Sequence, residues 1–139
     1  MTQHDNSHPT ISINNSTNKR PLWLDCDPGH DDAMAIILAC YHPSLELLGI
    51  STTCGNQTIE KTTNNACKIL QIINKIEVDV VAGSNAPLMR PSKICEEIHG
   101  ETGLDGTQFP VITKRALPSE TKAIYHMFHV ISKRYRATG

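Results

Sequence analysis

The stretch PLWLDCDPGHDDAMAIILAC, residues 21–40, gathers four carboxylates within eight residues, between two apolar segments. These acids are Asp25, Asp27, Asp31 and Asp32. Pro28 and Gly29 turn the chain inside the acidic group, which predicts a strand over about 21–27, a tight turn, and a buried helix over about 31–41. Four like charges so close together repel one another. Helix N-terminal N–H groups offset part of that cost, and a hard cation with oxygen ligands would offset the rest.

The alternation of predicted strands and helices continues after this stretch. Residues 45–53 are rich in β-branched residues towards their end, residues 58–74 carry apolar positions at helical spacing, and residues 78–82 predict a third strand. Such alternation is typical of a parallel sheet with right-handed crossovers. We therefore expect the first part of an open, mostly parallel, Rossmann-like α/β sheet flanked by helices.

The remaining segments carry weaker signals. Residues 1–20 are polar and rich in Asn, Ser and Thr, which predicts a disordered tail, so the folded part is expected to span residues 21–139. Residues 83–117 predict no regular element, and a loop of this length in a small domain is usually functional or disordered. A last helix is expected over about 119–134, with Ile124, Met127, Phe128 and Ile131 on one face.

Composition excludes several classes of protein. The formal net charge of −1 offers no case for nucleic acid or an anionic membrane, and no apolar run approaches the roughly 20 residues that span a bilayer. The five cysteines are odd in number and none has CxxC spacing, which disfavours a disulfide scaffold or a zinc site. Reduced, buried thiols and a cytoplasmic location are the expectation.

Two polar residues follow successive predicted strands, Asp27 after the first and Asn56 after the second. Ligands bind at the carboxyl ends of the strands in such sheets, so this edge is the predicted site. Carboxylates there suit Ca²⁺ or Mg²⁺, which polarises a bound water, and a neighbouring carboxylate then takes the proton. The alternative is ordinary helix capping by Asp31 and Asp32. For Asn56 alone, a turn residue with left-handed backbone is the simpler interpretation.

The histidines are individually weak signals. His99 lies beside Gly100 in the long loop, where a structural or exposed role is the simpler interpretation. His30 lies inside the acidic turn, where it would soften the repulsion between carboxylates. His126 and His129, three residues apart on the last helix, are expected on the helix surface rather than at a metal.

The acidic motif resembles the signature of the nucleoside hydrolase family of the inosine–uridine-preferring type. Residues 25–33, DCDPGHDDA, match its DxDPGxDDA pattern, which is long and specific. The resemblance continues through residues 47–52 and 55–58 and through HGETGLDG at residues 99–106, and it covers roughly residues 21–110.

The resemblance implies a Ca²⁺-dependent N-ribohydrolase. By it, Asp27 is a calcium ligand and the base that activates water, and Asp32 ligates calcium through both oxygens. Asp31 and Asn56 hold ribose hydroxyls, and His99 lies beside the nucleobase or leaving-group pocket. The implied partner is an inosine- or uridine-like ribonucleoside, with no nucleic acid and no membrane. A homo-oligomer is a possible assembly of the full-length family.

The chain is shorter than the resemblance leads one to expect. Family members run to about twice this length and carry further calcium and ribose ligands in their second half. We therefore expect a truncated N-terminal portion of a nucleoside hydrolase domain. A non-catalytic remnant or partner-binding fragment is the alternative. A phosphatase of the haloacid dehalogenase type also has DxD after its first strand, but Gly29 stands where such sites have a small hydroxyl residue.

Overall fold

The computed structural model describes residues 19–137, which form a small α/β domain. The tail expected over residues 1–20 lies, apart from residues 19 and 20, outside the described part of the chain. The elements run in the order β1 (Arg20–Cys26), α1 (His30–Tyr41), β2 (Leu45–Thr52), α2 (Ile59–Ile72), β3 (Val80–Ala82), α3 (Glu96–His99) and α4 (Ala123–Arg136). Among these residues no helix has the length and apolar character needed to cross a membrane.

The three strands form one parallel sheet in the order β1-β2-β3, as the alternation of elements predicts. The pairing of β1 with β2 runs from Arg20 opposite Leu45 to Cys26 opposite Thr52, so both strands end at the same edge. Trp23 lies across from Gly49, where a Cβ atom would come within 2.5 Å of the indole ring. Gly49 therefore leaves room for the indole on the neighbouring strand.

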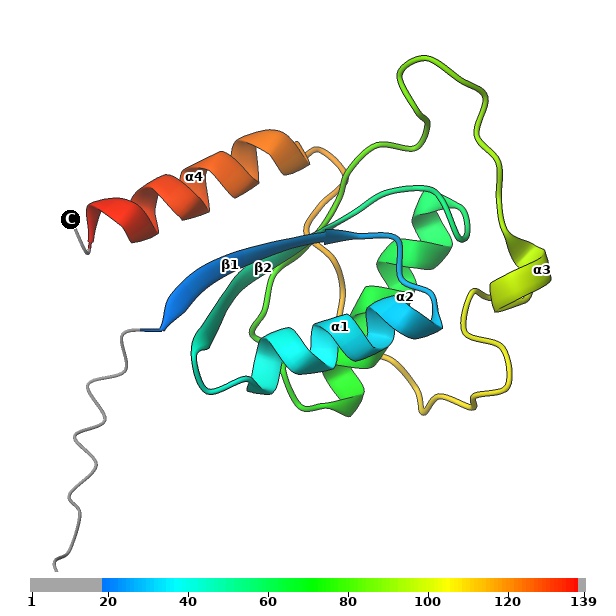
Figure 1. The fold of residues 1–139 in the computed structure, drawn as a ribbon, viewed down its shortest axis with the longest axis horizontal. Coiled ribbons are helices and arrows are strands. Elements are labelled where there is room, and N and C mark those ends of the chain that lie inside the picture. Colours follow the sequence, from blue (N-terminus) through cyan, green and yellow to red (C-terminus); the bar gives the residue numbers. More distant parts are fainter. Residues whose placement is uncertain (1–18, 138–139) are drawn as a thin grey trace, which may run out of the picture.

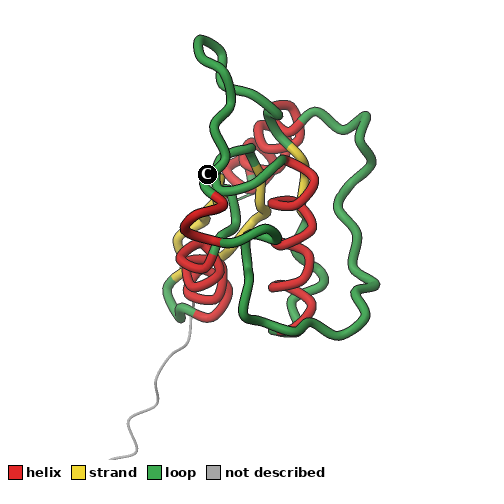
Figure 2. Tube along the Cα trace, turned by 90° about the vertical axis from the view of Figure 1, so that its right-hand side faces the viewer, coloured by secondary structure: helices red, strands yellow, loops and turns green. Residues whose placement is uncertain are grey.

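Helices cover both faces of the sheet (Figure 1). Both crossover helices, α1 and α2, contact each other and β2, while α4 contacts all three strands from the opposite face. Figure 2 shows the strands in yellow between these helices. Right-handed β-α-β crossovers place successive helices on one face, which explains why α1 and α2 share it.

The core lies between the sheet and the pair α1 and α2. Its fully buried apolar side chains come from all of these elements: Ile36, Ile50, Ala66, Leu70 and Val80. The prediction that α1 is buried all round was wrong. Met34 is 65% exposed and Leu38 60% exposed, because α1 lies in an outer layer and only one side of it meets α2 and the sheet.

The segment after β3 is irregular, as predicted, apart from the short helix α3. It is tied back to the domain by side chain to backbone contacts. The amide of Gln71 accepts from the backbone N–H groups of Thr113 and Lys114 at 2.7 and 2.9 Å. The N–H of Leu117 donates to the Val80 carbonyl at 2.8 Å, beside β3.

The last helix turns its expected apolar face outward. Ile124 and Phe128, which share that face, are 73% and 71% exposed. The contacts with the sheet come from another side of the helix. His126 Nε2 lies 3.2 Å from Asp79 Oδ2 and its ring meets the Trp23 indole edge-on at 5.9 Å. The expectation that His126 lies on a free helix surface was therefore wrong, whereas His129 is exposed.

Candidate active site

The site forms where β1 and β2 end. Asp27 directly follows β1, and the turn of residues 53–58 directly follows β2. Asn56 lies in that turn and makes two contacts with Asp27: its backbone N–H donates to Asp27 Oδ2 at 2.7 Å, and its side-chain Nδ2 donates to the Asp27 carbonyl at 3.0 Å. The structure therefore joins the two residues that the sequence places at this edge.

Gly55 allows this close approach between the two strand ends. A Cβ atom there would overlap the carboxylate of Asp27. The interpretation of Asn56 as a left-handed turn residue was wrong, because Asn74 is the one non-glycine residue with a positive φ in the described chain. Asn56 is instead a hydrogen-bond donor that fixes Asp27.

Asp32 completes a pair of carboxylates with Asp27. It lies in the first turn of α1, and its Oδ2 accepts the backbone N–H of Asp27 at 3.2 Å. Burial, and then the nearby carboxylate of Asp27, raise the pKa of Asp32. The alternative of helix capping by Asp31 and Asp32 was wrong, because Gly29 is the N-cap of α1 and no side chain caps it.

The remaining members of the acidic motif have separate surroundings. The hydroxyl of Ser51 donates to Asp25, and the Trp23 indole N–H donates to that hydroxyl at 3.0 Å. Asp25 thus belongs to a polar chain under α4.

The cysteine thiols take no part in this chain. Burial, followed by the nearby carboxylates, raises the pKa of the Cys26 thiol, which stays protonated. All five thiols are free, as expected, although only Cys26 and Cys67 are buried.

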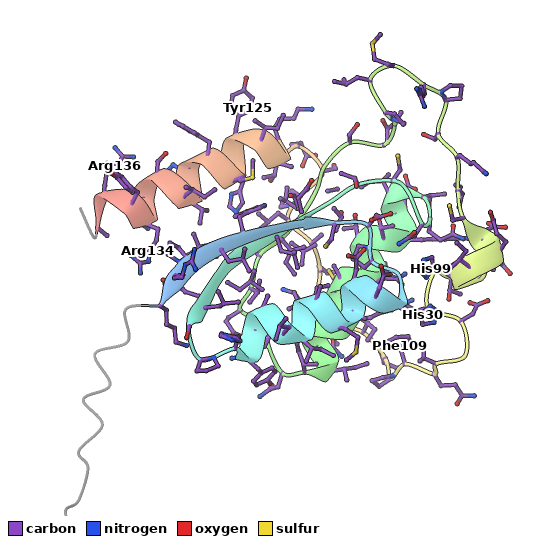
Figure 3. The ribbon with its side chains drawn as sticks, in the orientation of Figure 1. His30, His99, Phe109, Tyr125, Arg134 and Arg136 are labelled. Carbon is purple, nitrogen blue, oxygen red and sulfur yellow. The ribbon has the colours of Figure 1, made fainter. Side chains whose placement is uncertain are left out.

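His99 reaches the acidic turn from α3, although the path of the intervening loop could not be predicted (Figure 3). Its Nε2 atom lies 4.0 Å from Asp31 Oδ1, and its side chain is only 11% exposed. The ring of His30 stacks against it with centroids 5.6 Å apart. The side chain of His99 is therefore mostly buried within the site. Its Nε2 atom faces the carboxylate of Asp31, whose side chain is 80% exposed.

Two residues that sequence analysis did not select hold this arrangement together. Asn65, fully buried on α2, donates from Nδ2 to the carbonyls of Pro28 at 3.1 Å and Thr102 at 2.8 Å. Gln57 donates from Nε2 to the Gly100 carbonyl at 2.9 Å. The sequence signal that could have identified Asn65 is its position, as a polar residue, among the apolar positions of α2. The two bonds of Asn65 join the loop after His99 to the acidic turn, and the bond of Gln57 joins the same loop to the turn after β2.

The donor chemistry of the site fits a hard cation in part. Asp27 and Asp32 bring two carboxylates together, and their mutual repulsion contributes to the raised pKa of Asp32. Ca²⁺ takes six to eight oxygen ligands. Within residues 19–137 no group of three or more His, Cys, Asp or Glu side chains is arranged to hold a metal ion. The two carboxylates thus supply only part of such a ligand shell.

The chain resembles known proteins in sequence along much of its length. The family described as inosine-uridine preferring nucleoside hydrolase matches residues 22–138. A pyrimidine-specific ribonucleoside hydrolase RihA from Shewanella sp. (strain MR-4) is 53% identical over 91 residues, 66% of this chain and 29% of the relative. RihB from Escherichia coli O1:K1 / APEC, also pyrimidine-specific, is 50% identical over 98 residues, 70% of this chain and 31% of the relative.

Solved structures agree with this match. A purine-preferring ribonucleoside hydrolase from Gardnerella vaginalis superposes with a TM-score of 0.71 at 28% identity, over 82% of this chain and 37% of that one. The plant nucleoside hydrolase PpNRh1 gives a TM-score of 0.71 at 30% identity, over 81% and 36%. The chain spans about three tenths of the length of the curated relatives it matches. On the extent of these matches, the chain belongs to the inosine-uridine preferring nucleoside hydrolase family.

Proposed function

We propose that this chain carries part of a site that hydrolyses the N-glycosidic bond of ribonucleosides to ribose and free base. The observation that carries the proposal is the Asp27 carboxylate, which accepts the Asn56 backbone N–H at 2.7 Å, on a residue whose own backbone N–H binds Asp32 Oδ2 at 3.2 Å. A carboxylate fixed at a strand end beside a second carboxylate is suited to orient and deprotonate a water molecule. The proposal that the substrate is a ribonucleoside comes from membership of the family.

In this reaction Asp27 takes a proton from water. The water oxygen then bonds to the anomeric carbon of the ribose, and the bond between that carbon and the base nitrogen breaks with its electron pair on the base. The base takes up a proton from solvent, and Asp27 returns its proton to solvent. The Asn56 N–H supports this role because it holds Asp27 Oδ2 in place. Removing such a supporting hydrogen bond usually costs activity even though the base remains.

Calcium is the proposed cofactor, and Asp27 and Asp32 are the residues that would hold it. When bound, Ca²⁺ lowers the pKa of a coordinated water and orients it. Burial and then the charge of Asp27 raise the pKa of Asp32, and a bound cation would offset the repulsion between the two carboxylates. The remaining ligands are proposed to come from water and substrate.

Asp31 and His99 are proposed to contact the substrate. Asp31 is exposed and carries two acceptor oxygens, which suits the hydroxyls of a ribose. His99 presents a flat ring with one nitrogen towards Asp31, which suits a nucleobase. Pyrimidine ribonucleosides such as uridine are the preferred candidates, because the relatives RihA and RihB are named pyrimidine-specific.

The test is release of free base by the purified chain. Uridine and inosine are incubated with the chain in calcium and, separately, in chelator, and free base and reducing sugar are measured. We expect calcium-dependent release of uracil that Asp27→Asn removes while circular dichroism stays unchanged. Glu77→Gln, an exposed acid outside the site, is the control and retains activity. Equal release by the native chain and Asp27→Asn would remove Asp27 from the role of base.

A second candidate function is binding to another polypeptide without catalysis. The observation that favours it is the outward apolar face of α4, where Ile124, Tyr125 and Phe128 are 71–75% exposed. Neighbouring exposed apolar side chains on one surface commonly mark protein contacts. Sedimentation of the chain over a range of concentrations, with Phe128→Ser for comparison, tests this function. A monomer at every concentration speaks against self-association.

A further inference from the structure

His30 and His99 come from distant parts of the chain and meet face to face. His30 is the first residue of α1 and His99 the last of α3, and Figure 3 shows both at the same end of the molecule. Their rings stack with centroids 5.6 Å apart and an interplanar angle of 23°. Their Nδ1 atoms are 3.3 Å apart, within hydrogen-bonding distance.

The two nitrogens of His99 have different neighbours. Its Nδ1 faces the turn before α1, where the His30 backbone N–H lies at 3.4 Å and the His30 ring at 3.3 Å. Its Nε2 faces Asp31 Oδ1 at 4.0 Å. Nδ1 of His99 is thus tied to His30, and Nε2 of His99 is left to face the exposed Asp31.

The ring of His30 is itself held in place. Its Nε2 lies 3.0 Å from the backbone carbonyl of Asp105, which can only accept, so Nε2 is the donor. The carboxylate of Asp105 is fixed in turn by the backbone N–H groups of Glu101 and Thr102 at 3.0 and 3.1 Å. Those bonds, with the Thr102 hydroxyl as the first cause, lower the pKa of Asp105. A hydrogen-bonded loop thus holds the far side of the His30 ring.

We propose that His30 is a positioning residue that holds the His99 imidazole in a single orientation, with Nε2 presented to the substrate. This inference rests on the proposed function for its consequence in catalysis, and on the contacts of His30 for its physical basis. A ring flip of His99 would put Cδ2 where Nδ1 stands and Cε1 where Nε2 stands, so the bond to His30 would be lost. Support of this kind around a site residue is typically worth about tenfold or more in activity.

Three substitutions at His30 separate its two hydrogen bonds. His30→Asn places an amide where Nδ1 meets His99, His30→Gln places one where Nε2 meets the Asp105 carbonyl, and His30→Leu removes both. We expect His30→Asn to preserve the orientation of His99 best, His30→Leu to lose it, and His30→Gln to fall between. A role confined to filling space would make Leu as good as Asn.

The readout that needs no catalysis is nitrogen NMR of the histidine rings in the native chain and each variant, with His99→Gln to assign the signal. We expect one tautomer of His99 in the native chain and in His30→Asn, and averaged ring nitrogens in His30→Leu. Unchanged His99 signals in all three variants, or equal averaging in His30→Asn and His30→Leu, would overturn the proposal. Circular dichroism checks folding, and His30→Gln remains informative if His30→Leu does not fold.

Uridine hydrolysis is the second readout and keeps the two proposals apart. With an active native chain, we expect kcat/KM to fall about tenfold in His30→Leu and to recover largely in His30→Asn. If no nucleoside is hydrolysed by the native chain, the proposed function fails, and the NMR comparison alone still decides the role of His30. Averaged His99 signals with unchanged hydrolysis would show that the orientation of His99 does not serve the reaction.

Discussion

Asn56 holds Asp27 from two sides, through its backbone N–H to the carboxylate at 2.7 Å and through its side-chain amide to the backbone carbonyl at 3.0 Å. The first bond survives any substitution that keeps the backbone in place, whereas the second depends on the side chain. The side chain therefore fixes where the end of β1 lies relative to the end of β2, and with it the position of the proposed base.

Asn56→Ala is expected to lower nucleoside hydrolysis by about tenfold to a hundredfold, the usual effect of removing a supporting hydrogen bond next to a site residue. The measurement is steady-state release of uracil from uridine. Asn64→Ala, an exposed asparagine on α2, is the matched control and is expected to retain activity. Equal activity of the two variants would show that the position of Asp27 does not depend on this amide.

The sequence carried enough to place Asp27 and Asn56 together. Strand periodicity and the parallel topology bring the ends of successive strands to one edge, so local pattern alone locates both residues. The DPG turn likewise predicts the start of α1 to within one residue. Both placements were predictable because local periodicity locates each strand, and the parallel connection brings their carboxyl ends to the same edge.

The contacts of His99 with His30 and Asp31, and the bonds of Asn65, could not be predicted from the sequence. Asn65 and Gln57 help to hold His99 near Asp31 by binding the carbonyls of the loop at residues 100–102, and such tertiary bonds leave no periodic signal. The orientation of α4 was missed for a related reason. Its apolar face predicts burial, yet contacts of His126 with Asp79 and Trp23 turn another side to the sheet.

Stability of the calcium-free chain should depend on pH through Asp32. Burial and the neighbouring Asp27 raise the pKa of Asp32 above its ordinary 3.8, so the folded state binds this proton more tightly than the unfolded state. The contribution of Asp32 to the free energy of unfolding is therefore most favourable at or below pH 3.8 and falls as the pH rises through the raised pKa of the folded state.

Asp32→Asn is expected to remove this part of the pH dependence and to raise the free energy of unfolding near neutral pH, because an uncharged amide neither repels Asp27 nor resists burial. Urea unfolding in chelator at several pH values from 4 to 7 measures the effect. Glu77→Gln, more exposed and away from Asp27, is the control. Parallel pH profiles for the native chain and Asp32→Asn would contradict the assignment.

Gly29 leaves the space in which His99 and Asn56 approach the turn. A Cβ atom at this position would lie 2.7 Å from His99 Nδ1 and 2.9 Å from Asn56 Nδ2, and contacts under 3.0 Å force a shift. The φ angle of −104° suits any residue. Gly29→Ala should therefore change the His99 ring signals and lower hydrolysis by about tenfold, with little loss of stability.

Gly106→Ala provides the opposite case. A Cβ atom there meets nothing within 4 Å, but φ is +85°, which disfavours a side chain. We expect a loss of about 1 kcal/mol in the free energy of unfolding, measured in urea, with smaller changes at His99. A Gly29→Ala variant that loses as much stability as Gly106→Ala, and leaves the His99 signals alone, would refute the steric argument.

Docking of α4 on the sheet can be followed through Trp23, the one tryptophan of the sequence. Its indole meets the His126 ring edge-on at 5.9 Å, and His126 Nε2 is 3.2 Å from Asp79 Oδ2. His126→Ala removes both contacts, so we expect Trp23 fluorescence to shift to longer wavelength and the free energy of unfolding to fall by about 1 kcal/mol, a value typical of a partly exposed pair with added ring packing.

His129→Ala tests whether the effect belongs to this contact or to any loss of histidine from α4. His129 is exposed one turn further along the same helix, so its removal should leave both the fluorescence and the urea midpoint unchanged. Asp79→Asn keeps the Trp23 contact but removes the charge opposite His126, and should lower stability without the full fluorescence shift. If His126→Ala and His129→Ala behave alike, α4 is held by its other contacts, such as Arg134 with Glu46 at 2.7 Å.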